Sequence, residues 1–315
     1  MINTPDNETL YSEEQIHPGL QFLVFTGIFV LVLILGNIIG LGVASALYGF
    51  KDVMDIAQLK TSSPNAINTL WILQVAGTTL PILAAPVFFA YIIVQDPADY
   101  LKPNIKFPYW LLFLGFFIML IANPTIEILS NINQKLQLPE FLSGMQKWME
   151  ESEKNAQTIT GVMLKMPTIG TMFFDLFLIG LVTAIVEELM FRGVLQTIFA
   201  RWTQSYHAAV WITAVLFSAF HMEFFGFLPR VLLGALFGYF VVWSGSIWPA
   251  IWGHFVNNGS AVVASYLFQH KIIKTDPDNQ HLFNYAGYIL SFLILLALLF
   301  IFRKTATEQN KTAEG

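Results

Sequence analysis

The feature that most constrains this chain is an apolar stretch, Leu20 to Tyr48, that contains no charged residue. About 20 consecutive apolar residues cross the hydrocarbon core of a bilayer as a helix, so this stretch predicts a transmembrane span. The rest of the chain agrees, because 55% of its 315 residues are hydrophobic and only 12% are charged. Soluble domains usually carry about 25% charged residues. The chain is therefore expected to fold in a membrane.

Further apolar stretches follow the first one along the chain. They cover residues 66–94, 109–129, 169–200, 208–225, 228–243, 247–268 and 285–302. Helices satisfy their own backbone hydrogen bonds in lipid, whereas open sheets cannot. We therefore expect an all-α, polytopic transmembrane bundle of about eight helices in the cell membrane. The short stretch 228–243 leaves seven crossings as the alternative.

The domain organisation follows from where the polar residues lie. We expect a polar N-terminal tail over residues 1–19, one transmembrane domain over 20–302 and a polar C-terminal tail over 303–315. The N-terminal tail is acidic and lacks the basic region of a signal peptide. The C-terminal tail contains Arg303, Lys304 and Lys311, which favour a cytoplasmic C-terminus by the positive-inside rule.

The longest polar insertion, residues 130–165, has apolar side chains at helical spacing. These are Phe141, Met145, Trp148 and Met149. The spacing indicates an amphipathic helix lying on the membrane surface, and a solvated loop is the alternative.

Composition also excludes several classes of function. The chain has no cysteine, which excludes disulfides, thiolate nucleophiles and cysteine-ligated metals. Its formal net charge is −5, and it has no basic patch that could neutralise phosphates, so nucleic acid is not an expected partner. Any chemistry must use oxygen and nitrogen groups.

Ionisable residues inside the apolar stretches are concentrated in one third of the chain. They are Glu187, Glu188, Arg192, His221, Glu223 and His254, accompanied by Asn257 and Asn258. One ionised residue at mid-bilayer costs roughly 2.5–3.5 kcal/mol, so such a cluster indicates a functional site. The alternative is a structural ion pair that joins helices.

Spacing assigns different tasks to these residues. Glu188 and Arg192 are four residues apart and can pair on one helix face. That pairing leaves Glu187 free to act as a general base that activates water, with His221 holding the same water. His254 and Asn258, also four residues apart, can present two donors to the oxyanion of a tetrahedral intermediate. These parts are sufficient for adding water to an amide.

Three motifs carry a resemblance to a known family. Residues 187–193 (EELMFRG) match EExxxR, residues 217–221 (FSAFH) match FxxxH, and residues 254–258 (HFVNN) match HxxxN. In this order the chain resembles the CAAX-processing and bacteriocin-processing (CPBP, or Abi) intramembrane peptidases, over about residues 169–268. The resemblance implies an eight-helix bundle whose cavity opens to the cytoplasm. It also implies that Glu187 and His221 activate water, while His254 and Asn258 stabilise the oxyanion.

The expected function is thus intramembrane proteolysis of a membrane-embedded or lipidated protein or peptide. The expected partners are membrane lipids and that substrate, and the oligomeric state is left open. No cofactor is expected, although zinc held by Glu187, His221 and His254 is an alternative, disfavoured because the chain has no HExxH motif. A proton-coupled transporter and a non-catalytic scaffold or bacteriocin-immunity protein remain the competing functions.

Overall fold

The computed structural model describes residues 15–274 and 285–313, and every regular element in these ranges is helical. We call each long helical segment of the bundle a rod. Four rods are continuous α-helices: α1 (Pro18–Tyr48), α6 (Trp110–Gln134), α12 (Phe227–Ser244) and α13 (Trp248–Gln269). The chain closes with α14 (Tyr285–Ala313), and α11 (Tyr206–Phe220) is a shorter rod. The all-α prediction is confirmed.

Two other rods are built from several helical pieces. One joins α3 (Ala66–Gln74), η1 (Val75–Thr79), α4 (Leu80–Phe88) and η2 (Phe89–Ile93); the other joins α8 (Ile169–Asp175), η4 (Leu176–Val182), α9 (Thr183–Glu188), η5 (Leu189–Leu195) and α10 (Gln196–Thr203). The segments η1, η2, η4 and η5 are π-helical. In the first rod they flank α4, which contains Pro81 and Pro86, and neither proline has the N–H that an α-helical hydrogen bond needs.

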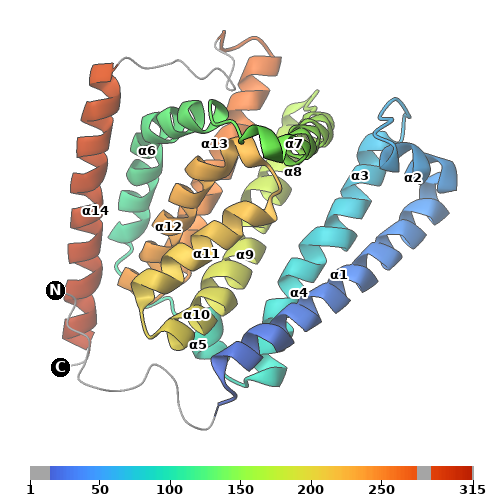
Figure 1. Ribbon diagram of the computed structural model, residues 1–315. Coiled ribbons are helices and arrows are strands. Elements are labelled where there is room, and N and C mark those ends of the chain that lie inside the picture. Colours follow the sequence, from blue (N-terminus) through green and yellow to red (C-terminus); the bar gives the residue numbers. More distant parts are fainter. Residues whose placement is uncertain (1–14, 275–284, 314–315) are drawn as a thin grey trace.

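Six of these rods are long and apolar enough to cross a membrane, so the protein is a multi-pass membrane protein. The stretch predicted over 208–225 is instead the 15-residue α11, because the chain turns after Phe220. α13 has the length of a span, but its His and Asn side chains make it more polar than the six. The start of α1 and the end of α14 lie on the same side of the bundle, at the bottom of Figure 1.

The rods differ in how much of their surface faces other helices. Only 6% of the most apolar part of α1 is buried, so this helix exposes its uncharged side chains to lipid. It contacts the α3–α4 rod where Gly36 and Gly40 allow a close approach, since a Cβ at Gly36 would lie 2.4 Å from the carbonyl oxygen of Ala76. The helices α9 to α13 contribute many of the buried core residues. The polar cluster lies on these inner helices.

Short helices cover the ends of the rods. At the top of Figure 1, α7 (Ser143–Met163) is seen nearly end-on and so lies across the direction of the rods, near α2 (Phe50–Ala57). At the bottom, α5 (Pro97–Leu101) lies beside α10. The insertion 130–165 is therefore helical rather than a loop over most of its length, and Phe141, Met145 and Trp148 are exposed on it.

The C-terminal tail differs from its prediction. Helix α14 continues to Ala313 instead of ending near residue 302. Arg303, Lys304 and Glu308 are good helix formers, and Lys304 pairs with Glu308 across one turn at 3.8 Å. Residues 1–14 of the predicted N-terminal tail lie outside the described residues.

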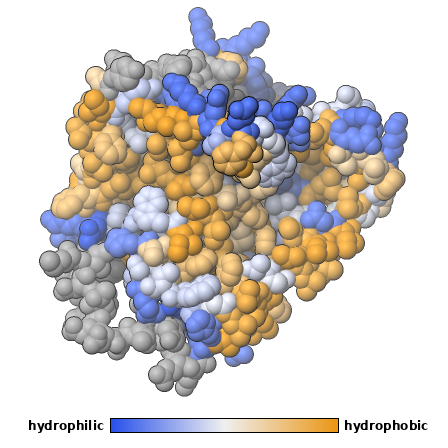
Figure 2. Space-filling model, in the orientation of Figure 1, coloured by the Kyte–Doolittle hydropathy of each residue, from blue (hydrophilic) through white to orange (hydrophobic). Residues whose placement is uncertain are grey.

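The surface in Figure 2 agrees with a membrane-spanning body. Hydrophobic residues cover the middle of the visible face, and hydrophilic residues gather toward its upper and lower ends. The upper hydrophilic band lies over α7 and α2. An apolar belt between two polar ends is what a bilayer requires of a spanning protein.

Candidate active site

The long rod 169–203 carries the two adjacent carboxylates at the point where its α-helical part ends. Glu187 and Glu188 are the last residues of α9, and the π-helical η5 begins immediately after them. Such π-helical turns are uncommon and occur frequently at functional sites. Gly193 in η5 lets α5 approach, because a Cβ there would lie 2.7 Å from the carbonyl oxygen of Tyr100. The motif glycine therefore serves packing.

Glu188 lies at the centre of a fully buried charge network. Its Oε1 is 3.1 Å from Nη1 of Arg192 and accepts a hydrogen bond from Nδ1 of His254 at 2.8 Å. Arg192 also donates from Nη2 to the carbonyl oxygen of Gly234 on α12, at 3.1 Å. The predicted pairing of Glu188 with Arg192 is confirmed. The network joins the rod 169–203 to α12 and α13.

Aromatic rings enclose this network. The guanidinium of Arg192 lies 4.3 Å from the ring centroid of Phe217 and 5.4 Å from that of Phe237. The ring of Phe237 also stacks on the imidazole of His254, with centroids 5.0 Å apart. These contacts favour a cation over the ring faces and exclude water from the pair. Phe217 is thus a packing residue of the site.

Glu187 meets two imidazoles on the other side of the network. Its Oε2 is 3.9 Å from Nε2 of His221 and 3.8 Å from Nε2 of His254. This oxygen is buried and has no hydrogen-bond partner among the described residues. His221 uses its Nδ1 to bond the carbonyl oxygen of Phe217 at 2.8 Å, which turns its Nε2 toward Glu187. The structure thus brings Glu187, His221 and His254 together.

The cluster is most open toward His221. The side chain of His221 is 26% exposed, against 10% for Glu187 and 4% for His254. His221 follows the last turn of α11, at the same end of the bundle as α7 and opposite the end of α14 (Figure 1). The side of the membrane toward which the site opens stays a prediction.

Asn258, which was predicted to present a donor beside His254, bonds two other residues. Its Nδ2 donates to the carbonyl oxygen of Ile179 in η4 at 3.3 Å, and its Oδ1 accepts from Asn257 at 3.1 Å. One hydrogen of the Asn258 amide is therefore used to hold α13 against η4. The second hydrogen stays available to a ligand.

The geometry of the cluster bears on the zinc alternative. Within the described ranges, no group of three or more His, Asp or Glu side chains is arranged to hold a metal ion. The two distances from Glu187 to the imidazoles exceed the roughly 3.3 Å that separates ligands about 2.0–2.1 Å from a tetrahedral zinc. The residues as they stand do not fit a zinc site.

Arg230 is a charged neighbour that sequence reasoning missed. It donates from Nη1 to the carbonyl oxygen of Glu223 at 2.9 Å and also bonds the Glu223 carboxylate. Burial raises the pKa of Glu223 above its ordinary value; Arg230 opposes the rise and Glu153 adds to it. In the sequence, Glu223 and Arg230 are only seven residues apart, on either side of the start of α12, and this spacing was the one indication that they could pair.

A second charge network lies at the other end of the rod 169–203. Arg201 donates to Asp99 at 2.5 Å, and Lys102 donates to Thr197 at 3.0 Å. Burial acts to raise the pKa of Asp99, but Lys102 and Arg201 together hold it below its ordinary value. Burial also lowers the pKa of Lys102 and raises that of Tyr100 to about 12.

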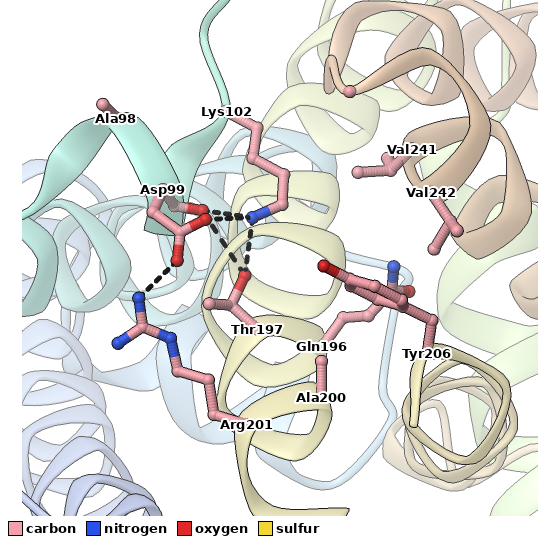
Figure 3. A pocket seen from close by; sticks show the side chains of 11 residues that line it. Ala98, Asp99, Lys102, Gln196, Thr197, Ala200, Arg201, Tyr206, Val241 and Val242 are labelled. Carbon is pink, nitrogen blue, oxygen red and sulfur yellow. Dashed lines mark hydrogen bonds and ion pairs between the residues drawn. The ribbon is translucent and has the colours of Figure 1, made fainter. Parts of the chain in front are cut away.

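This second network borders a cavity of about 290 Å³. In Figure 3 the polar side chains of Asp99, Lys102 and Thr197 form one wall, and Val241 and Val242 form the facing wall. None of the motif residues lines this cavity. It is therefore separate from the cluster around Glu187.

Comparison with known proteins agrees with the motifs. Residues 169–260 match the family model of type II CAAX prenyl endopeptidase Rce1-like proteins. The chain is also similar to the protein described as uncharacterized protein YpbD of Bacillus subtilis (strain 168), with 28% identity over 106 residues. That similarity covers 32% of this chain and 49% of YpbD, so the chain spans about half the length of the curated relative it matches. No solved structure shows a significant match.

The matched segment coincides with the helices that carry the cluster. Residues 169–260 begin at α8 and reach into α13, so they contain Glu187, His221 and His254. The segment 169–260 is therefore similar to Rce1-like proteins and lies within a multi-pass bundle, so the resemblance seen in the motifs is confirmed.

Proposed function

We propose that this protein is an intramembrane endopeptidase that hydrolyses a peptide bond of a membrane-embedded or lipidated protein or peptide. The observation that carries the proposal is the state of Glu187. Its buried Oε2 faces two imidazole nitrogens at 3.8 and 3.9 Å and has no hydrogen-bond partner in the described part of the chain. A carboxylate that is not neutralised by an arginine is suited to take a proton from water.

The distances around Glu187 suit one shared water. A water about 2.8 Å from both Glu187 Oε2 and one imidazole nitrogen would have an angle of about 85° at its oxygen between these two partners. Such an angle is common for water between two protein groups. His221 would therefore hold the water that Glu187 deprotonates, which leaves Nε2 of His254 for the oxyanion.

The reaction then needs few parts. The water oxygen attacks the carbonyl carbon of the scissile amide while Glu187 takes one of its protons, and the carbonyl oxygen becomes an oxyanion. Glu187 returns that proton to the amide nitrogen, the C–N bond breaks, and a carboxylic acid and an amine leave. General acid–base catalysis of this kind contributes roughly 10²–10⁴-fold.

The buried network supplies the positioning. Glu188 accepts a hydrogen bond from Nδ1 of His254, which orients the imidazole, and Arg192 pairs with the same carboxylate. A protonated His254 can donate from Nε2 to the oxyanion, and the second amide hydrogen of Asn258 can do the same. The aromatic walls at Phe217 and Phe237 exclude water and so strengthen these interactions.

We also propose that catalysis needs no metal. The widths of the two Glu187–imidazole gaps support this. Treatment of the purified protein with a chelator should leave turnover within about twofold of its original value. Loss of turnover that zinc restores would instead assign Glu187, His221 and His254 as metal ligands.

The proposed substrate is one that reaches the site from the bilayer. The cluster lies on helices that are enclosed by lipid-facing rods, and the similarity to Rce1-like endopeptidases favours a lipidated C-terminal segment. A nucleic-acid partner is not proposed, because the net charge is −5.

The test is a cleavage assay on the purified full-length protein with a library of lipidated and transmembrane peptides, read by mass spectrometry. The native protein should cleave at least one peptide, and Glu187→Ala and His221→Ala should each reduce that cleavage at least about 100-fold. Asn123→Ala, an exposed position on α6, serves as the control. Cleavage by both active-site variants at the native rate would overturn the proposal. A biological effect that survives Glu187→Gln would favour a non-catalytic scaffold or immunity protein.

A further inference from the structure

The position of His221 depends on the short connection that follows it, residues 222–226. His221 is the last residue of the α11 turn, and Met222 has a φ of 56°, in the left-handed region that few residues other than glycine adopt. The hydrogen bond of the imidazole goes to Phe217 in its own helix. That bond orients the ring within α11. The distance from the ring to Glu187 must then be set by whatever holds the connection.

Asn133, in the last turn of α6, bonds both the middle of this connection and the start of α12. Its Nδ2 donates to the carbonyl oxygen of Phe224 at 2.7 Å, and its Oδ1 accepts from the backbone N–H of Leu228 at 2.9 Å. The side chain is only 5% exposed. Buried hydrogen bonds of this kind are costly to leave unmade, so the amide fixes the connection against α6.

The neighbouring helices α11 and α12 add two further attachments. Ser218 on α11 donates from Oγ to the carbonyl oxygen of Phe227 at 2.8 Å. Arg230 on α12 donates to the carbonyl oxygen of Glu223 at 2.9 Å. The backbone on both sides of the 3₁₀ turn η6 (Phe224–Gly226) is therefore held in place.

Helix α7 closes the connection from outside. Glu153 Oε2 accepts a hydrogen bond from the backbone N–H of Phe225 at 3.3 Å, and the rings of Trp148 and Phe224 lie 5.2 Å apart. The helix crosses the end of the bundle at this point (Figure 1). Residues of α6 and α7, which lie outside the matched segment 169–260, thus grip the chain directly after His221.

We propose that Asn133 and Glu153 are positioning residues that hold His221 at its working distance from Glu187. The proposal rests on the proposed function, since it concerns the same water. A misplacement of about 1 Å in a catalytic group can cost about 100-fold in rate. Removing either attachment lets residues 222–226 relax from the strained conformation at Met222 and carries His221 away from Glu187.

The first test is kinetic and uses full-length protein on a peptide that the native protein cleaves. Asn133→Ala should lower kcat about 10- to 100-fold with KM changed less than about twofold, and Glu153→Ala should lower kcat about 3- to 10-fold. Matched controls are Asn123→Ala on α6 and Glu151→Ala on α7, both exposed and both expected to keep the native kcat. Unchanged kcat in Asn133→Ala and Glu153→Ala would overturn the proposal.

The second test measures position directly and needs no activity. Because the chain has no cysteine, a Glu187→Cys, His221→Cys protein can be treated with a short bifunctional methanethiosulfonate, and the cross-linking rate reports the proximity of the two positions. Adding Asn133→Ala or Glu153→Ala should slow cross-linking several-fold, whereas Asn123→Ala and Glu151→Ala should not. An unchanged rate in the first two would overturn the positioning role. If the native protein cleaves nothing, the proposed function fails while this measurement still tests the placement of His221.

Discussion

Two charge networks include residues of the same rod, 169–203, and they differ in how closely their charges are paired. Around Arg201 and Lys102, each cation donates directly to Asp99. Around Glu188, the carboxylate likewise meets Arg192 and His254 directly. Glu187, one residue away, meets only imidazoles, at 3.8 and 3.9 Å.

This difference indicates that the directly paired charges stabilise the fold, whereas Glu187 is available for chemistry. A charge that is paired inside the protein is stable and inert, because its partner already fixes its protonation state. A buried carboxylate without a hydrogen-bond partner costs free energy, and such strain persists where it serves a function. Ion-pair content alone would not distinguish the two ends of the rod. The contacts of the Glu187 carboxylate do, because its two imidazole partners lie at 3.8 and 3.9 Å, whereas Glu188 has partners at 2.8 and 3.1 Å.

The largest effect is expected at Glu187. Glu187→Gln removes the proton acceptor and should lower kcat by roughly 10²–10⁴-fold. The same change removes a buried charge that lacks a direct partner, so thermal stability should stay the same or rise. Turnover and thermal unfolding of detergent-solubilised protein measure both effects. A variant that loses stability together with activity would show that Glu187 is a structural charge.

The next effect is expected at Arg192, on stability. Arg192→Leu leaves Glu188 as a buried carboxylate without its guanidinium and should destabilise the protein by roughly 3–5 kcal/mol. The exposed Arg303→Leu on α14 is the control and should change stability by less than about 0.5 kcal/mol. Denaturant titration of both proteins in the same micelle makes the measurement. Equal stability of the two variants would remove the structural role of the pair.

A smaller effect is expected in the second network. Arg201→Gln breaks the bond to Asp99 and should cost roughly 1–2 kcal/mol, less than at Arg192 because water screens Asp99, whose side chain is 46% exposed. Turnover should stay within about twofold of native, since Arg201 lies outside the cluster. A loss of turnover without a loss of stability would show that the two networks are coupled.

The smallest effect is a pH dependence at the same place. Lys102 and Arg201 hold the pKa of Asp99 below its ordinary value against the effect of burial, so its contribution to stability is present above the ordinary pKa of an aspartate. The contribution is lost as the pH falls through the lowered pKa. The melting temperature should therefore fall less between about pH 5 and pH 3 in Asp99→Asn than in native protein. An Asp55→Asn variant, at the other end of the molecule, should follow the native curve.

Much of the fold could be predicted from sequence, because lipid imposes a strong rule. The uncharged stretch Leu20–Tyr48 became α1 almost to the residue. The stretch over 208–225 was placed too long, since Phe224 and Phe225 are apolar but belong to a turn held by tertiary contacts. The π-helical segments η4 and η5 have no local sequence signal.

The site could be predicted in part. A spacing of four residues was enough to pair Glu188 with Arg192. The free-energy cost of placing ionisable residues in lipid was enough to mark Glu187 and His221 as candidate site residues. The contact of His254 with Glu188 crosses 66 residues, and the attachments made by Asn133 cross more than 90, so neither follows from local spacing. Arg201 lies just beyond the apolar stretch 169–200, and its burial depends on contacts with Asp99 and Tyr100 of α5, which are distant in the sequence.

The most direct test of the account is a double-variant cycle on a peptide that the native protein cleaves. If Glu187 and His221 act on one water, Glu187→Gln combined with His221→Ala should be no more than about twofold slower than Glu187→Gln alone, because residues that act as a unit are not additive. Losses in kcat that multiply in the double variant, or native kcat in either single variant, would contradict the shared site.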